Sequence, residues 1–270
     1  MTIKALLVGI DTYPTAPLDG CGQDVIDMAN FLVDNNYFKP EEIDTLTDDR
    51  ATTEAIKQRI LRLISGMTSG GRYLLHYSGH GTQYAERDSS GEVTTYHDAI
   101  CPVDFDYSPE HMITDVDFQN LFDKIPTGAE FTWVSDSCYS GGLARDMVPR
   151  VSGGKSPRLF PISHDIQWRI ETARSINLPI LGFRAVALQL NGALIAACGA
   201  DETDWPVPNL GGHNGALTYG LLNQLKTPGG PTTPLKSLIL SVQKVLTNLG
   251  LLQHPELHGN PSITGKPFLV

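Results

Sequence analysis

Two short motifs carry the side chains that are best suited to chemistry in this sequence. HYSGHG occupies residues 76–81, and SDSCYSGG occupies residues 135–142. Each motif follows an apolar run that predicts a short buried strand. The ligand crevice of a parallel α/β sheet lies at the carboxyl ends of its strands, so we expect His80 and Cys138 to meet there. A thiol and an imidazole at one sheet edge are the minimum parts of a cysteine nucleophile and its general base.

The backbone beside these residues predicts an oxyanion hole. Cys138 is expected to leave its strand for a loop or helix, with its sulfur exposed and its N–H free to face substrate. Gly81 can offer a second N–H where a side chain would obstruct the approach. Donors of this kind are each worth about 3–4 kcal/mol when removed by mutation. No third catalytic residue is evident, and a backbone carbonyl is a candidate to orient His80.

The other cysteines and histidines near these motifs are interpreted as structural. Cys101 and Cys198 have the sequence surroundings of core thiols. His76 precedes His80 by four residues and could suggest a metal pair, but its apolar neighbours favour a buried core histidine. No set of residues has the ligand spacing of a zinc site, so no metal ligand is assigned.

Strand and helix signals alternate along the first half of the chain and predict an α/β fold with a mostly parallel sheet. The expected strands are 5–10, 43–46, 73–77 and 131–135, and the expected helices lie within 24–35, from 52 or 53 to about 64, and at 115–124. Residues 82–112 are expected to be irregular. The second half predicts a strand at 193–198 and helices at 216–224 and 235–249.

The composition restricts the class of protein and its partners. The 270 residues are 41% hydrophobic and carry a formal net charge of −10, which suits one large α/β domain. No run of Lys or Arg exceeds two residues, so nucleic acid is not an expected partner. No signal peptide and no apolar run of about 18 residues are seen, so a membrane is not expected either. Four cysteines without a disulfide framework favour the cytoplasm.

Only one stretch of the chain is basic, and it divides the sequence. We expect a single domain with a larger catalytic portion at about 1–143, a basic linker at about 144–185 and a smaller portion at about 186–270. The linker contains several Pro and Gly residues, and its basic residues are Arg145, Arg150, Lys155, Arg158, Arg169, Arg174 and Arg184.

The two motifs resemble the histidine and cysteine motifs of metacaspases, which are caspase-like cysteine peptidases whose prokaryotic members are also called orthocaspases. His80 and Cys138 are 138 − 80 = 58 residues apart, close to the spacing of about 50 known for caspases. Further matches to family motifs are LDGCGQD at 18–24, DAICPVD at 98–104 and QHPEL at 253–257. The caspase signature Gln-Ala-Cys-x-Gly is absent around Cys138, which favours the metacaspase branch.

The resemblance implies a caspase-like three-layer α/β/α sandwich and an acidic pocket for the residue before the cleaved bond. The pocket residues that carry over are Cys21, Asp24, Ser78 and Asp136. Two carboxylates in one pocket would select a cation, and the planar fork of Arg suits them better than Lys. A simpler interpretation of Asp24 is a first-turn helix residue that the helix dipole favours.

The resemblance also raises the question of calcium, which many metacaspases bind through aspartates. Asp98 and Asp115 match such positions, but Thr114 stands where a second Asp is usual and Asp146 aligns only approximately. Calcium takes six to eight oxygen ligands. We therefore expect no required cofactor, and weak or absent calcium dependence.

The sequence thus predicts a cysteine endopeptidase that acts on protein or peptide substrates after Arg or Lys. Such an enzyme would carry its own substrate in the linker, and Arg145, Arg150, Lys155 and Arg158 are the expected sites of self-cleavage. The two fragments are expected to stay associated. Two alternatives stay open: a peptidase of the same fold that prefers Asn or Asp, and a non-catalytic signalling module. Reporter substrates would separate the first, and intact Cys138 and His80 argue against the second.

Overall fold

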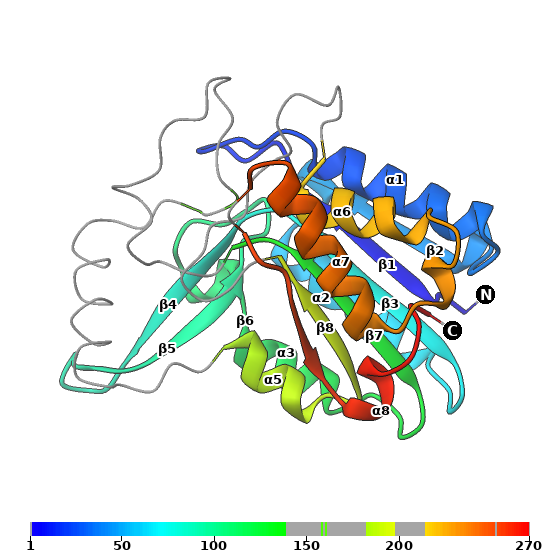
Figure 1. The fold of residues 1–270 in the computed structure, drawn as a ribbon. Coiled ribbons are helices and arrows are strands. Elements are labelled where there is room, and N and C mark those ends of the chain that lie inside the picture. The colour runs from blue at the N-terminus through cyan, green and yellow to red at the C-terminus, as the bar shows by residue number, and fades with distance from the viewer. Residues whose placement is uncertain are drawn as a thin grey trace.

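The computed structural model describes residues 2–138, 158, 160, 182–197, 214–251 and 253–269. Its main sheet has six strands in the order β2-β1-β3-β7-β8-β9 (Figure 1). These strands are β1 (Ala5–Gly9), β2 (Ile43–Thr47), β3 (Arg72–Ser78), β7 (Glu130–Asp136), β8 (Gly192–Ala196) and β9 (Glu256–Gly259). Five of them are parallel, and β9 runs antiparallel to β8 at the edge. The prediction of a mostly parallel central sheet is confirmed.

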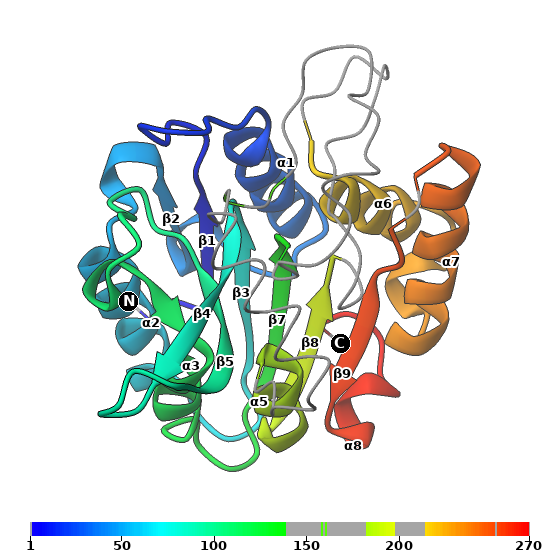
Figure 2. The ribbon, with the colours of Figure 1, turned by 90° about the vertical axis from the view of Figure 1, so that its left-hand side faces the viewer.

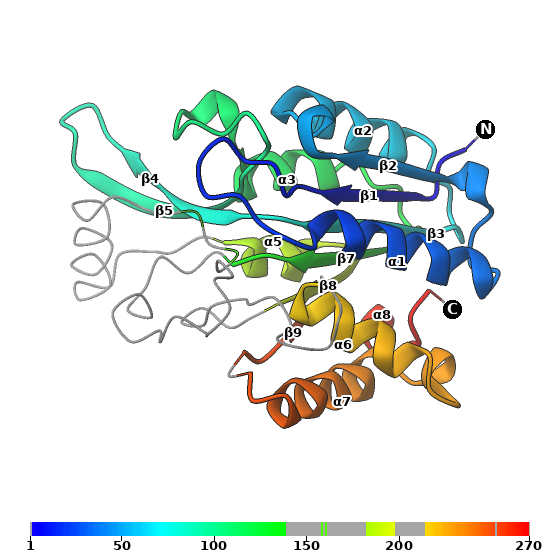
Figure 3. The same cartoon turned by 90° about the horizontal axis from the view of Figure 1, so that it is seen from above.

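Helices cover both faces of this sheet (Figure 3). On one face lie α1 (Cys21–Asp34), α6 (Ala216–Leu225) and α7 (Leu235–Asn248), and on the other lie α2 (Thr53–Ser65), α3 (Asp115–Phe122) and α5 (Phe183–Gln189). A short α8 (Pro261–Thr264) follows β9, and 3-10 turns occur at Pro40–Glu42, Asp48–Arg50, Pro109–His111 and Gly230–Thr232. The layers form the α/β/α arrangement that the resemblance implies.

The inner strands β1 and β8 are apolar throughout because both of their faces are buried. In β1, Leu6 and Val8 join the core beneath α2 and α3, whereas Ala5 and Leu7 join the core beneath α1 and α6. This alternation follows the two-residue period of a strand. A strand covered on both faces therefore has no polar face, which is why the sequence signal is a continuous apolar run.

A second sheet corrects the expectation that residues 82–112 are irregular. β4 (Gly81–Arg87) and β5 (Val93–Ile100) form an antiparallel hairpin, and β6 (Ile113–Thr114) pairs with β5. The turn is closed by Asp88, whose Oδ1 accepts N–H groups from Ser90 and Glu92. The hairpin extends away from the main sheet (Figures 1 and 3). Because polar residues are frequent in both strands, its hydrophobic pattern is weak.

Parallel pairing brings the two motifs together. β3 and β7 are neighbours, and their register places Ser78 opposite Asp136 (Figure 2). His80 follows Ser78 by two residues, and Cys138 follows Asp136 by the same distance. The fold therefore brings the two motifs to the same edge of the sheet, as the sequence predicts. Among the described residues, no helix is both long and apolar enough to cross a membrane.

Candidate active site

The two residues proposed for catalysis lie side by side at the ends of neighbouring strands, and both are buried. Cys138 has no exposed surface, and His80 is 1% exposed. The expectation that the Cys138 sulfur is exposed is therefore wrong for this state of the chain. The reason is that residues 158 and 160 lie over this edge of the sheet and hydrogen-bond to it.

Two backbone N–H groups converge on one carbonyl oxygen at this edge. Gly81 N–H lies 3.2 Å and Cys138 N–H lies 3.4 Å from the carbonyl oxygen of Arg158. These are the two donors that the sequence predicts for an oxyanion hole. A peptide carbonyl held by both donors, with a thiol beside it, has the arrangement that acyl transfer requires.

The ring of His80 is fixed by a backbone carbonyl from the loop that follows β1. Its Nε2 lies 2.7 Å from the carbonyl oxygen of Ala16, whose backbone is in the left-handed region at φ 61°. Because a carbonyl oxygen only accepts, Nε2 carries the proton and Nδ1 is the basic nitrogen of the neutral ring. Burial lowers the pKa of His80 to about 4, against the opposing effect of the Ala16 and Arg158 carbonyls. His80 is therefore a neutral base at physiological pH.

Two buried tyrosines hold the backbone of His80 in place. The Tyr13 hydroxyl accepts the N–H of His80 at 3.0 Å and donates to the carbonyl of Cys101 at 2.8 Å. The Tyr77 hydroxyl donates to the carbonyl of His80 at 2.7 Å. A Cβ at Gly79 would lie 2.7 Å from each hydroxyl, so this approach requires glycine. Tyr77 belongs to the histidine motif, but nothing in the sequence marks Tyr13.

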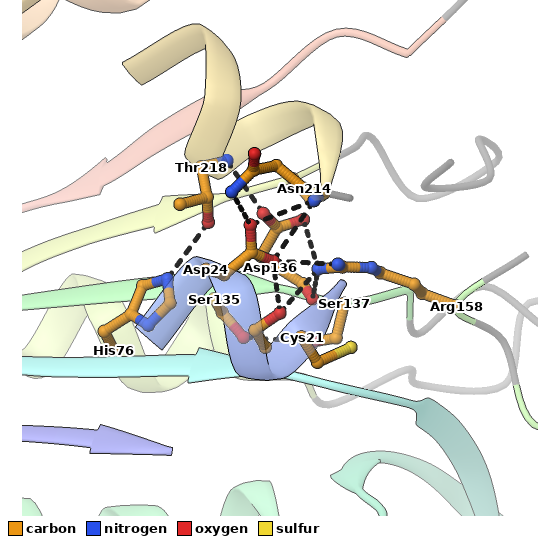
Figure 4. Close-up of polar contacts among 12 residues, drawn as sticks. Cys21, Asp24, His76, Ser135, Asp136, Ser137, Arg158, Asn214 and Thr218 are labelled. Carbon is orange, nitrogen blue, oxygen red and sulfur yellow. Dashed lines mark hydrogen bonds and ion pairs between the residues drawn. The ribbon is translucent and has the colours of Figure 1, made fainter. Parts of the chain in front are cut away.

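An acidic pocket, formed by Cys21, Asp24, Ser78 and Asp136, holds the side chain of Arg158. Figure 4 shows the guanidinium of Arg158 beside Asp24 and Asp136. The Nη2 of Arg158 lies 2.8 Å from Oδ2 of Asp24, and its Nη1 lies 3.1 Å from Oδ1 of Asp136. Nη1 also donates to the Ser78 hydroxyl at 2.7 Å and to the Asp136 carbonyl at 3.2 Å. Three of the four predicted pocket residues thus contact one buried guanidinium, and the Cys21 thiol interacts with Ser78. Arg158 is itself one of the predicted cleavage sites.

The rear of the pocket is built by the start of α6, which sequence reasoning missed. Gly215 N–H donates to both oxygens of Asp24, and Thr218 N–H donates to Oδ2 of Asp136 at 2.7 Å. Asn214 donates to Oδ1 of Asp24 at 3.0 Å. These N–H groups at a helix start favour negative charge and orient the two carboxylates toward the cation. The only sequence signal was the predicted start of a helix at residue 216.

His76 supports this wall through Thr218. Its Nε2 lies 3.0 Å from the hydroxyl of Thr218 (Figure 4). Burial lowers the pKa of His76 to about 4, so its ring is neutral. The interpretation of His76 as a buried core histidine agrees with this position.

Burial also controls the protons of the pocket. It raises the pKa of Asp24 to about 6; the charge of Asp136 acts in the same direction, and the guanidinium of Arg158 opposes both. Burial also raises the pKa of the Cys21 thiol, which keeps that thiol neutral. Two carboxylates this deeply buried need a bound cation to remain charged together.

The aspartates considered for calcium form a separate group, the Asp98–Asp115 cluster. Asp98 accepts hydrogen bonds from Gln83 Nε2 at 3.3 Å and from the N–H of Phe183 at 3.2 Å. Asp115 lies 2.7 Å from Nδ1 of His97. Burial raises the pKa of Asp98 to about 7. Protein donors engage both oxygens of Asp98 and Oδ1 of Asp115, whereas Oδ2 of Asp115 is buried without a hydrogen-bond partner among the described residues. One open oxygen is far short of the six to eight ligands that calcium takes, so the described residues fit calcium poorly.

The remaining residues considered for calcium do not complete such a site in the part of the chain that the structure describes. Thr114 uses its hydroxyl to cap α3, where it accepts the N–H of Asp117 at 3.2 Å. Asp146 lies outside the described residues, as do Cys198, Arg145, Arg150 and Lys155. Within the described ranges, no three His, Cys, Asp or Glu side chains are arranged to hold a metal ion.

Comparison with known proteins identifies relatives of this chain. A family model described as "Metacaspase, peptidase C14 domain" matches residues 3–146. Metacaspase-9 of Arabidopsis thaliana is 30% identical over 98% of this chain and 96% of its own length. Metacaspase-1 of Schizosaccharomyces pombe is 34% identical over 91% of this chain and 64% of its own length.

Other relatives are longer than this chain. Metacaspase-4 of Arabidopsis thaliana is 40% identical over 53% of this chain, and the match covers only 34% of that protein. Among solved structures, a Geobacter sulfurreducens protein aligns with a TM-score of 0.71 and covers 100% of this chain and 99% of its own, at 21% identity. That structural likeness supports the fold.

Proposed function

This chain belongs to the metacaspase family of cysteine-type peptidases, and from that premise we propose that it cleaves peptide bonds after Arg, and more slowly after Lys. Cys138 would be the nucleophile, His80 the base and then the acid, and Gly81 and Cys138 the oxyanion donors. Asp24 and Asp136, with Ser78 and Cys21 beside them, would hold the basic side chain. We further propose that the chain cleaves itself after Arg158.

The observation that carries the proposal is the placement of Arg158. Its guanidinium is paired with two carboxylates while its own carbonyl oxygen faces two N–H donors. The side chain before the bond and the carbonyl of the bond are thus engaged at the same time. This is how a substrate would have to lie for attack by Cys138.

The chemistry follows from these contacts. The Cys138 thiol would give its proton to Nδ1 of His80, and the sulfur would attack the carbonyl carbon of Arg158. Negative charge on the oxygen would be stabilised by the N–H groups of Gly81 and Cys138. His80 would then protonate the departing amine of residue 159, leaving a thioester on Cys138. Water, deprotonated by His80, would hydrolyse that thioester.

The preference for Arg over Lys rests on the number and direction of the acceptors. Carboxylate, hydroxyl and backbone oxygens surround the two terminal nitrogens of Arg158. The planar guanidinium has five N–H donors in a fixed fork and can satisfy several acceptors at once, whereas an ammonium is a compact point charge. A panel of fluorogenic peptides ending in Arg, Lys, Asn or Asp tests this order, and equal cleavage after Asp and Arg would contradict it.

Intact mass spectrometry tests the self-cleavage. After prolonged incubation at high concentration, wild type should yield a fragment of residues 1–158, while Cys138→Ala and Arg158→Gln should lack it. Arg184→Gln is the matched control, because Arg184 pairs with Glu256 at 2.9 Å and lies outside the acidic pocket. An uncut wild type, or a Cys138→Ala protein cut at the same bond, would contradict the proposal.

A further inference from the structure

A cluster of aromatic side chains receives Phe160, two residues after Arg158. The ring of Phe160 is 2% exposed. Its centroid lies 4.7 Å from that of Phe105, 5.0 Å from His80, 5.6 Å from Tyr107 and 5.9 Å from Tyr13. The interplanar angles are 64° to 83°, so each contact has the edge-to-face geometry that aromatic pairs prefer.

The backbone of Phe160 is held by the same glycine that contacts the Arg158 carbonyl. Gly81 N–H donates to the Arg158 oxygen at 3.2 Å, and Phe160 N–H donates to the Gly81 oxygen at 3.0 Å. The two bonds lie on either side of one residue of β4, as when an extended peptide pairs with the edge of a sheet. Main-chain pairing of this kind is independent of sequence, so selectivity has to come from the side-chain pocket.

The walls of this pocket come from parts of the chain that precede Cys138. Tyr13 follows β1, His80 follows β3, and Phe105 and Tyr107 follow β5. Phe105 is only 8% exposed, whereas Tyr107 is 48% exposed and has φ 70°, so Tyr107 forms the solvent-facing rim. Fixed walls with an open rim suit an exchangeable occupant better than a permanent core residue.

We infer that Tyr13, Phe105, Tyr107 and the ring of His80 form a subsite for an aromatic side chain two residues after the cleaved bond. This inference rests on the proposed function, because that function makes Arg158 the residue before the bond. An occupant of this subsite covers the imidazole on the leaving-group side. It therefore positions the departing amine against His80 and excludes water from it.

The test compares two quenched fluorescent peptides on the self-cleaved enzyme. Both have Arg before the bond, and they differ only in having Phe or Ala two residues after it. Burial of a Phe side chain together with its edge-to-face contacts predicts a kcat/KM about tenfold or more higher for the Phe peptide. An Arg-fluorophore reporter, which has no residue after the bond, measures the proposed function separately.

Variants of the pocket locate the effect. Phe105→Ala and, in case that variant folds poorly, Tyr107→Ala should lower the Phe-to-Ala ratio of kcat/KM toward one. Leu188→Ala is the matched control, since Leu188 is 72% exposed on α5, and it should leave the ratio unchanged.

If the reporter is cleaved but wild type shows no preference for the Phe peptide, the subsite is wrong and the proposed function stands. If Phe105→Ala and Tyr107→Ala both fold and both keep the wild-type Phe-to-Ala ratio of kcat/KM, the subsite is also wrong. An uncleaved reporter overturns both proposals.

Discussion

Two pairs of buried aspartates in this molecule are neutralised in different ways. In the acidic pocket, Asp24 and Asp136 receive a guanidinium from residue 158, which is 134 residues along the chain from Asp24. In the Asp98–Asp115 cluster, Asp115 pairs with His97 from the adjacent strand, and Asp98 accepts hydrogen bonds from Gln83 and Phe183. The first pair needs a cation from elsewhere, whereas neighbouring protein groups satisfy every oxygen of the second pair except Oδ2 of Asp115.

The difference shows why buried charge alone does not identify a binding site. A site for an exchangeable cationic ligand has hydrogen-bond acceptors oriented toward the ligand. The helices and strands that line such a site contribute no cationic side chain to it. The acidic pocket has this character, since α1, β3, β7 and α6 supply carboxylates, a hydroxyl and N–H groups around Arg158. The Asp98–Asp115 cluster has the character of a structural ion pair.

The largest difference is expected between Asp136→Asn and Asp115→Asn. Removing Asp136 leaves a substrate guanidinium partly unpaired in a buried site, which costs about 2–5 kcal/mol. Cleavage of Arg reporters should therefore fall by about 30-fold to 5,000-fold in kcat/KM. Asp115→Asn, with its folding checked by circular dichroism, should retain kcat/KM within about threefold. Equal losses of kcat/KM in the two variants would show that the acidic pocket and the Asp98–Asp115 cluster do not differ in function.

Gly215→Ala should have a smaller effect, through the space of the pocket. A Cβ at residue 215 would lie 2.2 Å from Nη1 of Arg158 and 2.5 Å from Oδ2 of Asp136. We expect a rise in KM of about tenfold for Arg substrates, because the cation has to shift from its two carboxylates. Gly265→Ala serves as control, as its Cβ would meet only Pro261 O at 3.2 Å. Unchanged Arg kinetics in Gly215→Ala would contradict the pocket geometry.

His97→Gln should reduce stability in a pH-dependent way. The hydrogen bond that His97 donates to Asp115 raises the pKa of His97, and Glu86 acts in the same direction. The ion pair therefore contributes fully below the unfolded-state pKa of about 6.5 and is lost as the pH rises through the higher folded-state value. We expect a deficit of about 1 kcal/mol at pH 6 that shrinks by pH 9, measured by urea unfolding. A deficit in the free energy of unfolding that grows with pH would contradict an ion pair between protonated His97 and Asp115.

The smallest effect is expected from chelation. Because protein donors occupy three of the four carboxylate oxygens of Asp98 and Asp115 and leave only Oδ2 of Asp115 open, removing calcium with a chelator should change reporter cleavage by less than about twofold. The measurement is a rate with and without chelator, followed by addition of calcium. If the chelator abolishes activity and calcium alone restores it, the description of the Asp98–Asp115 cluster as a structural ion pair is wrong.

The fold and the residues at the strand ends were accessible from the sequence because their signals are local. Apolar runs mark the buried strands, and parallel pairing then brings His80 and Cys138 to one edge. The hairpin of β4 and β5 was missed because polar residues are mixed with apolar ones along both strands. The contribution of Asn214 could not be predicted, because it reaches Asp24 across 190 residues of sequence.

The register of β3 and β7 makes the site sensitive to changes in chain length. Inserting one residue within β7, before Ser135, would bring Ser135 opposite Ser78 in place of Asp136, and would turn the side chains that follow the insertion to the other face. One such insertion would remove a carboxylate from the pocket and displace Cys138 by about 3.3 Å along the strand. The turn at residues 88–92 has no such constraint, since lengthening it moves neither His80 nor Cys138. Evolution can therefore vary the length of the hairpin freely, while β3 and β7 have to keep theirs.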